Sequence, residues 1–494
     1  MKSDTKEVGK NTIIYGLGNA LNKLLGFILI PIYTSFISIS DFGVLAILEI
    51  SVLAMIQLLN FGVIGGHQRY FYLKNEEGSY GKFLFSNYSF LWVILLVIII
   101  PATFFSNQLS IFLFSKPDYS EEVLVTLAII FLEVLVVIPF QILQFSKKPK
   151  IYIFYSFSKL ALSLLFTIYF VVFQSMGIYG LLLGRLIGLI VIYFFQLVFI
   201  IGKNVKFKFD FQSISTSIQY GFPIILYSIG YIIFTFSDRY MLNWLSTEEQ
   251  VGMYSFGYKM ANFINLIFIQ SIGMSYLPSI FENENKEDKH IFFAKMSKMY
   301  LVGMSVLTVG FLSFYKMLLI PFIKDDSYIL GLMVVPIMSV SFIIHGLNHF
   351  INVGIFLKNK TKYLFYISII TASLNILLNF LLIPPYGFLG VAFATLISQF
   401  INTLLMGYFS NKLLPISLDY KSFILVFLVF SSFILYFVFV SFNQLWIELI
   451  INTLFFAIVL LVLYRFGTNS YEKSEINGLI TNGFNRVIHK KSKV

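Results

Sequence analysis

The chain has 494 residues, of which 58% are hydrophobic and 12% are charged, with 58 Phe and no Cys. This composition excludes an ordinary soluble globular protein and predicts a polytopic membrane protein. The formal net charge of +11 is spread over short loops, without a basic patch interleaved with stacking aromatic residues, which argues against nucleic-acid binding. The lack of Cys also excludes disulfides, iron–sulfur clusters and thiol catalysis.

About fourteen hydrophobic runs follow one another along the chain, each long enough to cross about 30 Å of hydrocarbon. The first run follows a charged segment and is too long for the apolar part of a signal peptide, so we expect it to be a retained helix. The runs cover residues 11–36, 42–66, 80–105, 121–143, 151–173, 176–201, 213–243, 251–278, 293–315, 328–357, 363–383, 387–411, 421–442 and 445–466. The predicted fold class is therefore an all-α polytopic membrane protein.

Basic residues orient the runs. Of the 35 Lys and Arg residues, 27 lie in the two tails, in alternate gaps or at the edges of the runs that border those gaps; three lie in the other gaps, and five lie well inside the runs. Because cytoplasmic loops are enriched in Lys and Arg, we expect an even number of spans with both termini in the cytoplasm. This arrangement suits a multi-pass protein of a bacterial cytoplasmic membrane.

An internal repeat predicts the domain organisation. The segment GIYGLLLGRLIG begins at Gly177, and the similar segment GFLGVAFATLIS begins at Gly387. A repeat of six helices preserves orientation, so we expect two parallel six-helix lobes around a central cavity. The predicted division is an N-lobe at 1–205, a C-lobe at 206–415, a helix pair without a counterpart at 416–466, and a cytoplasmic amphipathic tail at 467–494.

Charged residues inside the runs are the strongest functional signal. A Lys or Arg at the bilayer centre costs roughly 2.5–3.5 kcal/mol. The five basic residues exceed the three acidic ones at comparable depth by two, which predicts an anionic cargo. Structural ion pairs are the alternative, with Glu133 joined to Lys159 or Arg185. The charges are Lys23, Lys159, Arg185, Arg239 and Lys259, with Glu49, Glu133 and Asp238.

Polar residues also share helical faces with these charges. Such a face avoids lipid, so it either lines an aqueous cavity or hydrogen-bonds a neighbouring helix. Lys159, near the expected cytoplasmic end of its run, is predicted to extend to the interface. The polar faces carry Asn19 and Asn22 beside Lys23, Asn262 beside Lys259, and Asn375 with Asn379.

Two histidines stand one helical turn apart in the run at 328–357. His345 and His349 could suggest a metal site, but the sequence contains no HExxH motif and no carboxylate close to them. We therefore predict no metal site, and expect these side chains to form hydrogen bonds within the bundle.

Three segments together resemble a known family. NKLLGFILIPIYTSFISISDFGVL (22–45), SDRYMLNWLSTEEQVGMYSFGYKM (237–260) and NILLNFLLIPPYGFLGVAFATLIS (375–398) are similar to the polysaccharide-export flippases of the multidrug/oligosaccharidyl-lipid/polysaccharide exporter superfamily. The resemblance implies a fourteen-helix, V-shaped bundle that passes a polyprenyl-diphosphate-linked oligosaccharide from the inner to the outer leaflet, for surface polysaccharides such as O-antigen or capsule.

The resemblance also implies roles for single residues. The related lipid II flippases carry basic residues in their first and eighth helices that meet the diphosphate, and Lys23 and Lys259 match those places. Lys lacks the bidentate geometry of Arg, which weakens the match. We expect Lys23, Lys259, Arg239 and Arg185 to attract the diphosphate, with alternating access between the lobes.

The resemblance and the charged residues also lead to expectations about the energy source for transport and about partner proteins. We expect no cofactor and no enzymatic activity; Na⁺, H⁺ or the membrane potential would drive transport, with Glu49, Glu133 and Asp238 as candidate coupling residues. Glycan polymerases are candidate partners, and a monomer suffices. The alternatives are a multidrug exporter of the same superfamily, which would need acidic binding residues, and a membrane glycan polymerase or ligase, for which no catalytic constellation is visible.

Overall fold

The computed structural model is helical throughout the residues it describes. No strand occurs among them, and nine of their helices are long and apolar enough to cross a membrane. The all-α membrane fold is therefore confirmed, while the count of fourteen spans and the cytoplasmic termini stay predictions. The described residues are 29–273, 276, 280, 283, 286–358, 360, 362–416, 419–439, 445–468 and 473.

Two compact units divide the chain. The boundary follows neither the repeat nor a single point in the sequence, because two segments far along the chain belong with the first half. The predicted division at residue 205 stays a prediction. Unit 1 comprises Met1–Phe256, Phe322–Gly331 and Ala372–Val391, and unit 2 comprises Gly257–Pro321, Leu332–Thr371 and Ala392–Val494.

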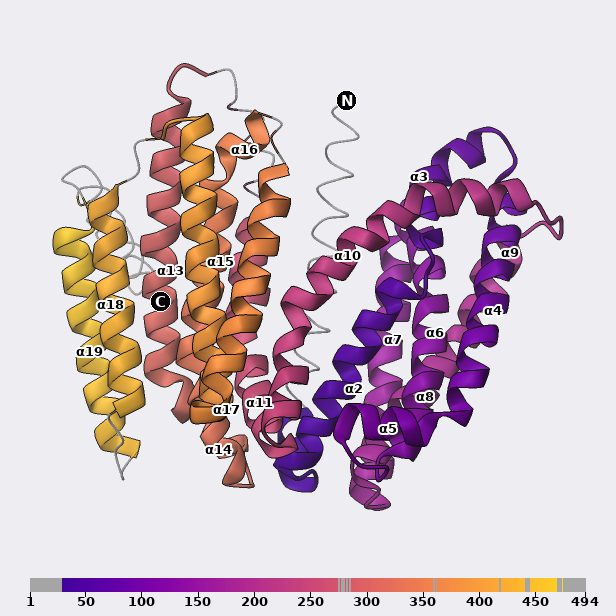
Figure 1. The fold of residues 1–494 in the computed structure, drawn as a ribbon, viewed down its shortest axis with the longest axis horizontal. Coiled ribbons are helices and arrows are strands. Elements are labelled where there is room, and N and C mark those ends of the chain that lie inside the picture. The colour runs from indigo at the N-terminus through magenta and orange to yellow at the C-terminus, as the bar shows by residue number, and fades with distance from the viewer. Residues whose placement is uncertain are drawn as a thin grey trace, which may run out of the picture. The chain divides into compact units, whose positions relative to one another are not determined.

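Unit 1 is a layered bundle of apolar helices (Figure 1). Helix α8 packs against α6 and α7, α6 also contacts α2 and α4, and α10 crosses α3. Turns of π-helix extend α7 to Phe173 and α8 to Ile201. The helices are α2 (Ile39–Leu58), α3 (Val63–Glu76), α4 (Tyr80–Phe104), α5 (Ser106–Phe114), α6 (Ser120–Phe145), α7 (Pro149–Ile168), α8 (Gly177–Gln196), α9 (Gly202–Asn204), α10 (Phe211–Leu245) and the start of α11 (Glu248–Ile264).

The run predicted at 42–66 differs from the structure, which has two helices there. Helix α2 ends at Leu58, and the backbone turns through positive φ angles of 49° at Phe61 and 80° at Gly62. The side chain of Asn60 fixes this turn by accepting a hydrogen bond from the Gly62 amide at 2.8 Å. A glycine suits the turn because positive φ strains other residues, and because α10 passes so close that a Cβ at Gly62 would clash with the backbone of Gly221.

Unit 2 is built around α13. This helix contacts α15, α18 and α19, and α18 also contacts α19. Ion pairs tie the C-terminal helix pair to α13: Lys316 Nζ lies 2.6 Å from Glu448 Oε1, and Lys298 Nζ lies 3.2 Å from Asp419 Oδ2. The helices outside unit 1 are α13 (Lys289–Leu319), α15 (Val334–Ile351), α16 (Val353–Leu357), α18 (Tyr420–Phe439) and α19 (Leu445–Phe466), while α14 (Ser327–Gly331) belongs to unit 1 and α17 (Lys362–Leu413) contributes to both units.

The two repeat-related glycines share an unusual backbone conformation. Gly177, at the start of α8, and Gly387, inside α17, each have a φ of 55°. At Gly387 the backbone leaves helical geometry, so α17 consists of two helical halves joined at a kink. The same conformation at equivalent positions supports the repeat read from the sequence.

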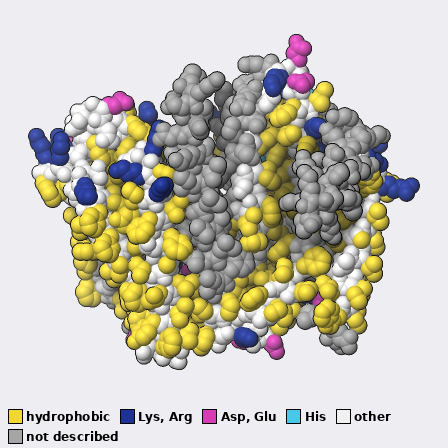
Figure 2. Space-filling model, turned by 180° about the vertical axis from the view of Figure 1, so that it is seen from behind, with side chains coloured by type: hydrophobic (Ala, Val, Ile, Leu, Met, Phe, Trp, Pro, Cys, Tyr) yellow, Lys and Arg dark blue, Asp and Glu magenta, His cyan; other side chains and the backbone are white. Residues whose placement is uncertain are grey.

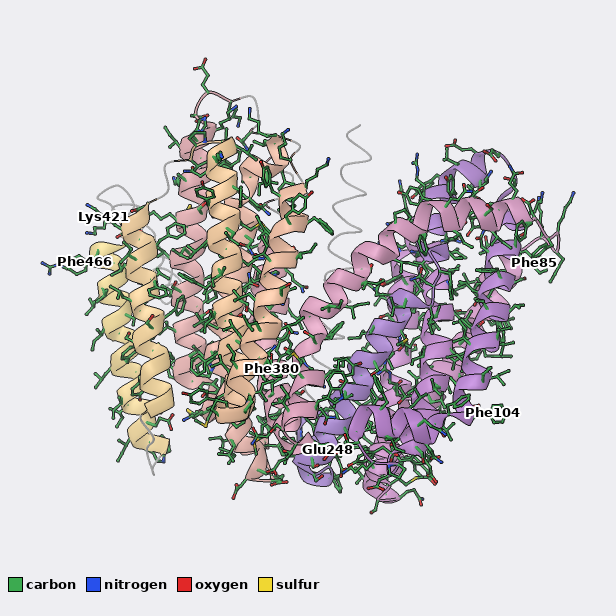
Figure 3. All side chains as sticks on the ribbon, in the orientation of Figure 1. Phe85, Phe104, Glu248, Phe380, Lys421 and Phe466 are labelled. Atoms are coloured by element: carbon green, nitrogen blue, oxygen red, sulfur yellow. The ribbon has the colours of Figure 1, made fainter. Side chains whose placement is uncertain are left out.

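The surface matches a membrane environment. Hydrophobic side chains cover the length of the helices, and basic side chains gather toward one end (Figure 2). Exposed apolar residues include Phe104 of α4, at 80% exposure, and Phe466 of α19, at 66%, both labelled in Figure 3. In water such a surface would be unfavourable, so lipid is its natural surrounding.

Candidate functional site

Small residues bring α7 and α8 unusually close together. Gly180, Gly184 and Gly188 recur every fourth residue, so they form one stripe along α8. A Cβ at Gly184 would clash with the backbone of Thr167, and one at Gly188 would clash with Ser163. This close approach sets Lys159 of α7 and Arg185 of α8 beside the same face of α6.

The carboxylate of Glu133 binds both of these cations. Glu133 lies near the middle of α6 and is 8% exposed. Its Oε2 accepts a hydrogen bond from Lys159 Nζ at 2.9 Å, and its Oε1 accepts one from Arg185 Nη2 at 3.0 Å. We call Glu133, Lys159 and Arg185 the charged triad.

The charged triad carries a net positive charge inside a candidate membrane span. The side chains of Lys159 and Arg185 are 23% and 26% exposed, so both remain partly accessible while Glu133 is covered. Lys159 was predicted to extend toward the membrane interface. Instead, its ammonium group binds the carboxylate of Glu133 near the middle of α6. The ion pair considered for Glu133 is present, and it includes both candidate partners.

A second charged cluster joins α10 to α11. Asp238 and Arg239 are 4% and 5% exposed. Arg239 Nη1 donates to Asp238 Oδ1 at 2.9 Å, and the Tyr254 hydroxyl donates to Asp238 Oδ2 at 2.7 Å. The Arg239 guanidinium also lies 5.2 Å from the centre of the Tyr254 ring, a favourable cation–π distance. The cluster is neutral as a whole, so Arg239 is engaged within the protein.

Of the two lysines that the resemblance singles out, Lys259 lies within the described residues. Lys259 of α11 belongs to unit 2, and its side chain is exposed. Asn262, one turn later, accepts a hydrogen bond from Asn265 at 2.9 Å. Lys23, together with Asn19 and Asn22, lies outside the described residues.

The other predicted residues take part in local contacts. In α17, Asn379 donates to the side-chain oxygen of Asn375 at 3.0 Å, and both residues are buried. Glu49 of α2 is half-buried. The structure therefore brings Glu133 together with Arg185, Asp238 with Arg239, and Asn375 with Asn379, as three separate groups.

A buried polar network in unit 2 was not recognised from the sequence. Asn348 of α15 donates to Asn402 at 3.1 Å, Asn402 donates to Thr371 at 3.0 Å, and Thr403 donates to Asn348 at 2.9 Å. The signal was present as polar residues in two runs that come together only in three dimensions. Asn348 lies between His345 and His349, which the sequence did single out.

Comparisons with known proteins agree with this architecture. The model of a family described as polysaccharide biosynthesis protein matches residues 8–284, which is more than half of the chain. The chain spans 45–66% of the length of the curated relatives it matches. Among them is the protein named probable low-salt glycan biosynthesis flippase Agl15 of Haloferax volcanii, 20% identical over 43% of this chain and 46% of its own length.

Solved structures share the fold over most of the chain. The lipid II flippase MurJ, in an inward closed conformation, aligns with 92% of this chain and 99% of its own, with a TM-score of 0.71 and 20% identity. An inward-facing multidrug resistance transporter of the MATE family aligns with 79% of this chain and 94% of its own, with a TM-score of 0.63 and 13% identity. The match of the family model over more than half of the chain shows that the chain belongs to the polysaccharide biosynthesis protein family.

Proposed function

We propose that the protein is a flippase that moves a polyprenyl-diphosphate-linked oligosaccharide from the inner to the outer leaflet of the bacterial cytoplasmic membrane. The observation that carries the proposal is the charged triad, in which two cations share one carboxylate near the middle of candidate membrane spans. A net positive charge at this depth is costly unless it has a use. A diphosphate group is the anion that a chain of this family would meet there.

The candidate cations differ in how accessible they are to a diphosphate group. Arg185 keeps part of its guanidinium exposed, and Arg can bind a phosphate through two parallel hydrogen bonds. The side chain of Lys259 is exposed as well. Arg239 is buried against Asp238 and Tyr254, so we assign it to positioning α10 against α11. Lys23 keeps the role that the resemblance implies.

The transport step would follow from charge and from alternating access. The cations attract the diphosphate, the glycan occupies the aqueous interior, and the polyprenyl chain remains in lipid. A membrane potential that is negative inside drives an anion outward by about 2.3 kcal/mol per charge per 100 mV. Rearrangement of the six-helix repeats would then expose the cargo on the other side.

The experiment is export of surface glycan in the native host after replacement of the chromosomal copy. The double variant K23A/K259A should lose export while it still inserts into the membrane, which is checked by immunoblotting of membrane fractions. K147A/K150A, which removes two lysines from a predicted cytoplasmic gap, should export normally. Wild-type export by K23A/K259A would contradict the proposed role of these lysines.

A multidrug exporter is the second candidate, because the MATE transporter shares the fold. Transporters of cationic drugs need net negative binding sites, whereas the charged triad is net positive. Resistance to cationic dyes in cells that express the protein tests this candidate. Dye resistance together with unchanged glycan export in the deletion strain would favour it over the flippase.

A further inference from the structure

Helix α15 is buried along nearly its whole length except at one window. From Val334 to Ile351 only His345 and His349 are exposed, and Ile344 is half-buried. The two histidines are four residues apart, so they lie on the same face of the helix. We call these two side chains the histidine window.

Exposed positions elsewhere along the spans are mostly apolar, as lipid requires, and exposed hydroxyl groups among them, such as those of Ser368 in α17 and Thr453 in α19, donate to the carbonyl four residues earlier. On α17, for example, Phe380 is 61% exposed and Leu404 is 56% exposed; Phe380 is labelled in Figure 3. A helix that is otherwise buried gains nothing by presenting two imidazoles to lipid. The histidine window is therefore best explained by contact with water.

A buried polar layer lies behind the histidine window. The side chain of Gln399 of α17, which is 5% exposed, lies next to His345. The Nε2 atom of Gln399 has no partner among the described residues. Asn348, on the turn between the histidines, belongs to the network with Asn402 and Thr403. This layer lies on one side of the histidine window, and the ring of His349 also lies against Gly273.

Among the described residues, the neighbours of α15 place no acid beside the histidine window. Its described contacts include α13, α16, α17, α18 and the π-helical turn Asn265–Ile269, and none of these elements contains Asp or Glu. Helix α11, which contacts Phe342 through Tyr258, carries its acidic residues, Glu248 and Glu249, only in its first turn. At the level of the window, α13 contributes Tyr300, whose hydroxyl donates to the Ile343 carbonyl at 3.0 Å. Beyond these, Tyr276 stacks on Phe350, and Lys259 follows Tyr258, whose ring contacts Phe342. The other titratable groups of these elements are Lys289, His290, Lys295, Lys298, Tyr315, Lys316, Lys362, Tyr363, Tyr366, Tyr386, Tyr408, Lys412, Tyr420, Lys421 and Tyr436.

Two of the three acidic residues first considered for ion coupling are bound to cations. Glu133 holds Lys159 and Arg185, and Asp238 holds Arg239 and the Tyr254 hydroxyl. A carboxylate that is bound to cations is harder to protonate. An imidazole nitrogen, in contrast, can take up and release a proton, and His side chains serve in proton relays within membranes.

We infer that His345 and His349 form a proton-binding site that couples proton movement to transport in unit 2. A neutral imidazole nitrogen accepts one proton from water, forming an N–H bond as the O–H bond of a hydronium ion breaks, and later returns it to water. Two cationic imidazoles one turn apart repel each other, so the pair carries one proton at a time. The coupling role rests on the proposed transport function, whereas the aqueous window does not.

The first test measures whether the histidine window is aqueous. Because the chain has no Cys, single variants H345C and H349C provide unique thiols for a membrane-impermeant maleimide. Both should be labelled in native vesicles. L404C, at an exposed apolar position, and S339C, at a fully buried one, should remain unlabelled over the same time. Labelling of H345C and H349C no faster than that of L404C overturns the inference whatever the cargo is.

The second test measures proton coupling in proteoliposomes that contain the full chain and a trapped pH-sensitive dye. Wild-type protein should move about one proton per glycan lipid, and one unit of pH gradient should change the transfer ratio by up to about tenfold. H345Q/H349Q, which keeps polar side chains but cannot be protonated, should flip lipid without response to the gradient. Transfer by wild-type protein without proton movement, or a retained gradient response in H345Q/H349Q, overturns the coupling while the flippase assignment stands. Absence of any transfer by wild-type protein instead contradicts the flippase.

Discussion

Units 1 and 2 keep polar groups inside the membrane by different means. In unit 1 the central groups are ions, and the charged triad and the Asp238–Arg239 pair satisfy one another through charge. In unit 2 the corresponding groups of α15 and α17 are amides, hydroxyls and imidazoles linked by neutral hydrogen bonds. An ion left without its partner is very costly in a low-dielectric interior, whereas a broken neutral bond costs much less. The polar residues of the two units should therefore differ in their sensitivity to mutation.

Removal of the shared carboxylate in unit 1 should have the largest effect. E133Q leaves Lys159 and Arg185 both unpaired and should lower the free energy of unfolding by about 3–5 kcal/mol. K159M removes one of the two cations and leaves a neutral Glu133–Arg185 pair, so it should cost less than about 1 kcal/mol. Denaturant unfolding in detergent micelles measures both. Equal losses for the two variants would contradict the shared carboxylate.

The glycine stripe that supports the charged triad should come next. G184A places a Cβ against the backbone of Thr167, which cannot move like a flexible side chain, so we expect a loss of about 1–3 kcal/mol. G303A in α13 is the matched control, because no atom lies within 4 Å of its added Cβ. It should be neutral or gain up to about 1 kcal/mol from helix propensity. Thermal unfolding in the same detergent compares the two variants. An equal effect of both would contradict the role of the glycine stripe in helix packing.

The neutral network of unit 2 should respond more mildly. N402L removes the hydrogen bonds of Asn402 to Asn348 and Thr371, and such bonds within membranes average about 0.6 kcal/mol each. We therefore expect a loss of about 1 kcal/mol by denaturant unfolding. A loss as large as that of E133Q would remove the distinction between the units.

Two carboxylates outside the spans, one in each unit, should have the smallest effect on the free energy of unfolding. This effect should depend on pH. The hydrogen bond from Ser213 lowers the pKa of Asp210, and Lys82 adds to this against a smaller opposing effect of burial. At Asp419 burial acts to raise the pKa, but Ser422 and Lys298 more than offset it and the pKa is lowered. A lowered pKa in the folded state stabilises the protein above the ordinary Asp value of about 3.9, and this stability is lost as the pH falls through the folded value.

Asp-to-Asn variants test the direction of this pH dependence in both units. D210N and D419N should each be less stable than wild type by no more than about 1 kcal/mol at pH 7. The difference should shrink as the pH falls below about 4, because the wild-type carboxyl then becomes neutral as well. Unfolding measured from pH 3 to pH 7 gives the answer, and a difference that grows in acid would reverse the assignment.

The sequence predicted the class of the fold because hydropathy responds directly to the membrane. The lengths of the runs, the repeat around Gly177 and Gly387, and the depth of Glu133 needed no tertiary information. It did not predict the break after Leu58, which depends on a side chain capping its own turn. The identity of each ion pair also required the structure, because the distance between Lys159 and Arg185 depends on glycines that allow two helices to approach.

Transfer of lipid-linked glycan by the purified protein tests the central claim most directly. Proteoliposomes would contain a fluorescent glycan on a polyprenyl diphosphate, or the same glycan on an uncharged lipid, and quenching by an impermeant reagent would report the leaflet. The account predicts rapid transfer of the diphosphate form, little transfer of the uncharged form, and a loss of this preference in R185Q. Equal transfer of both forms by the wild-type protein would contradict an anion-selective flippase.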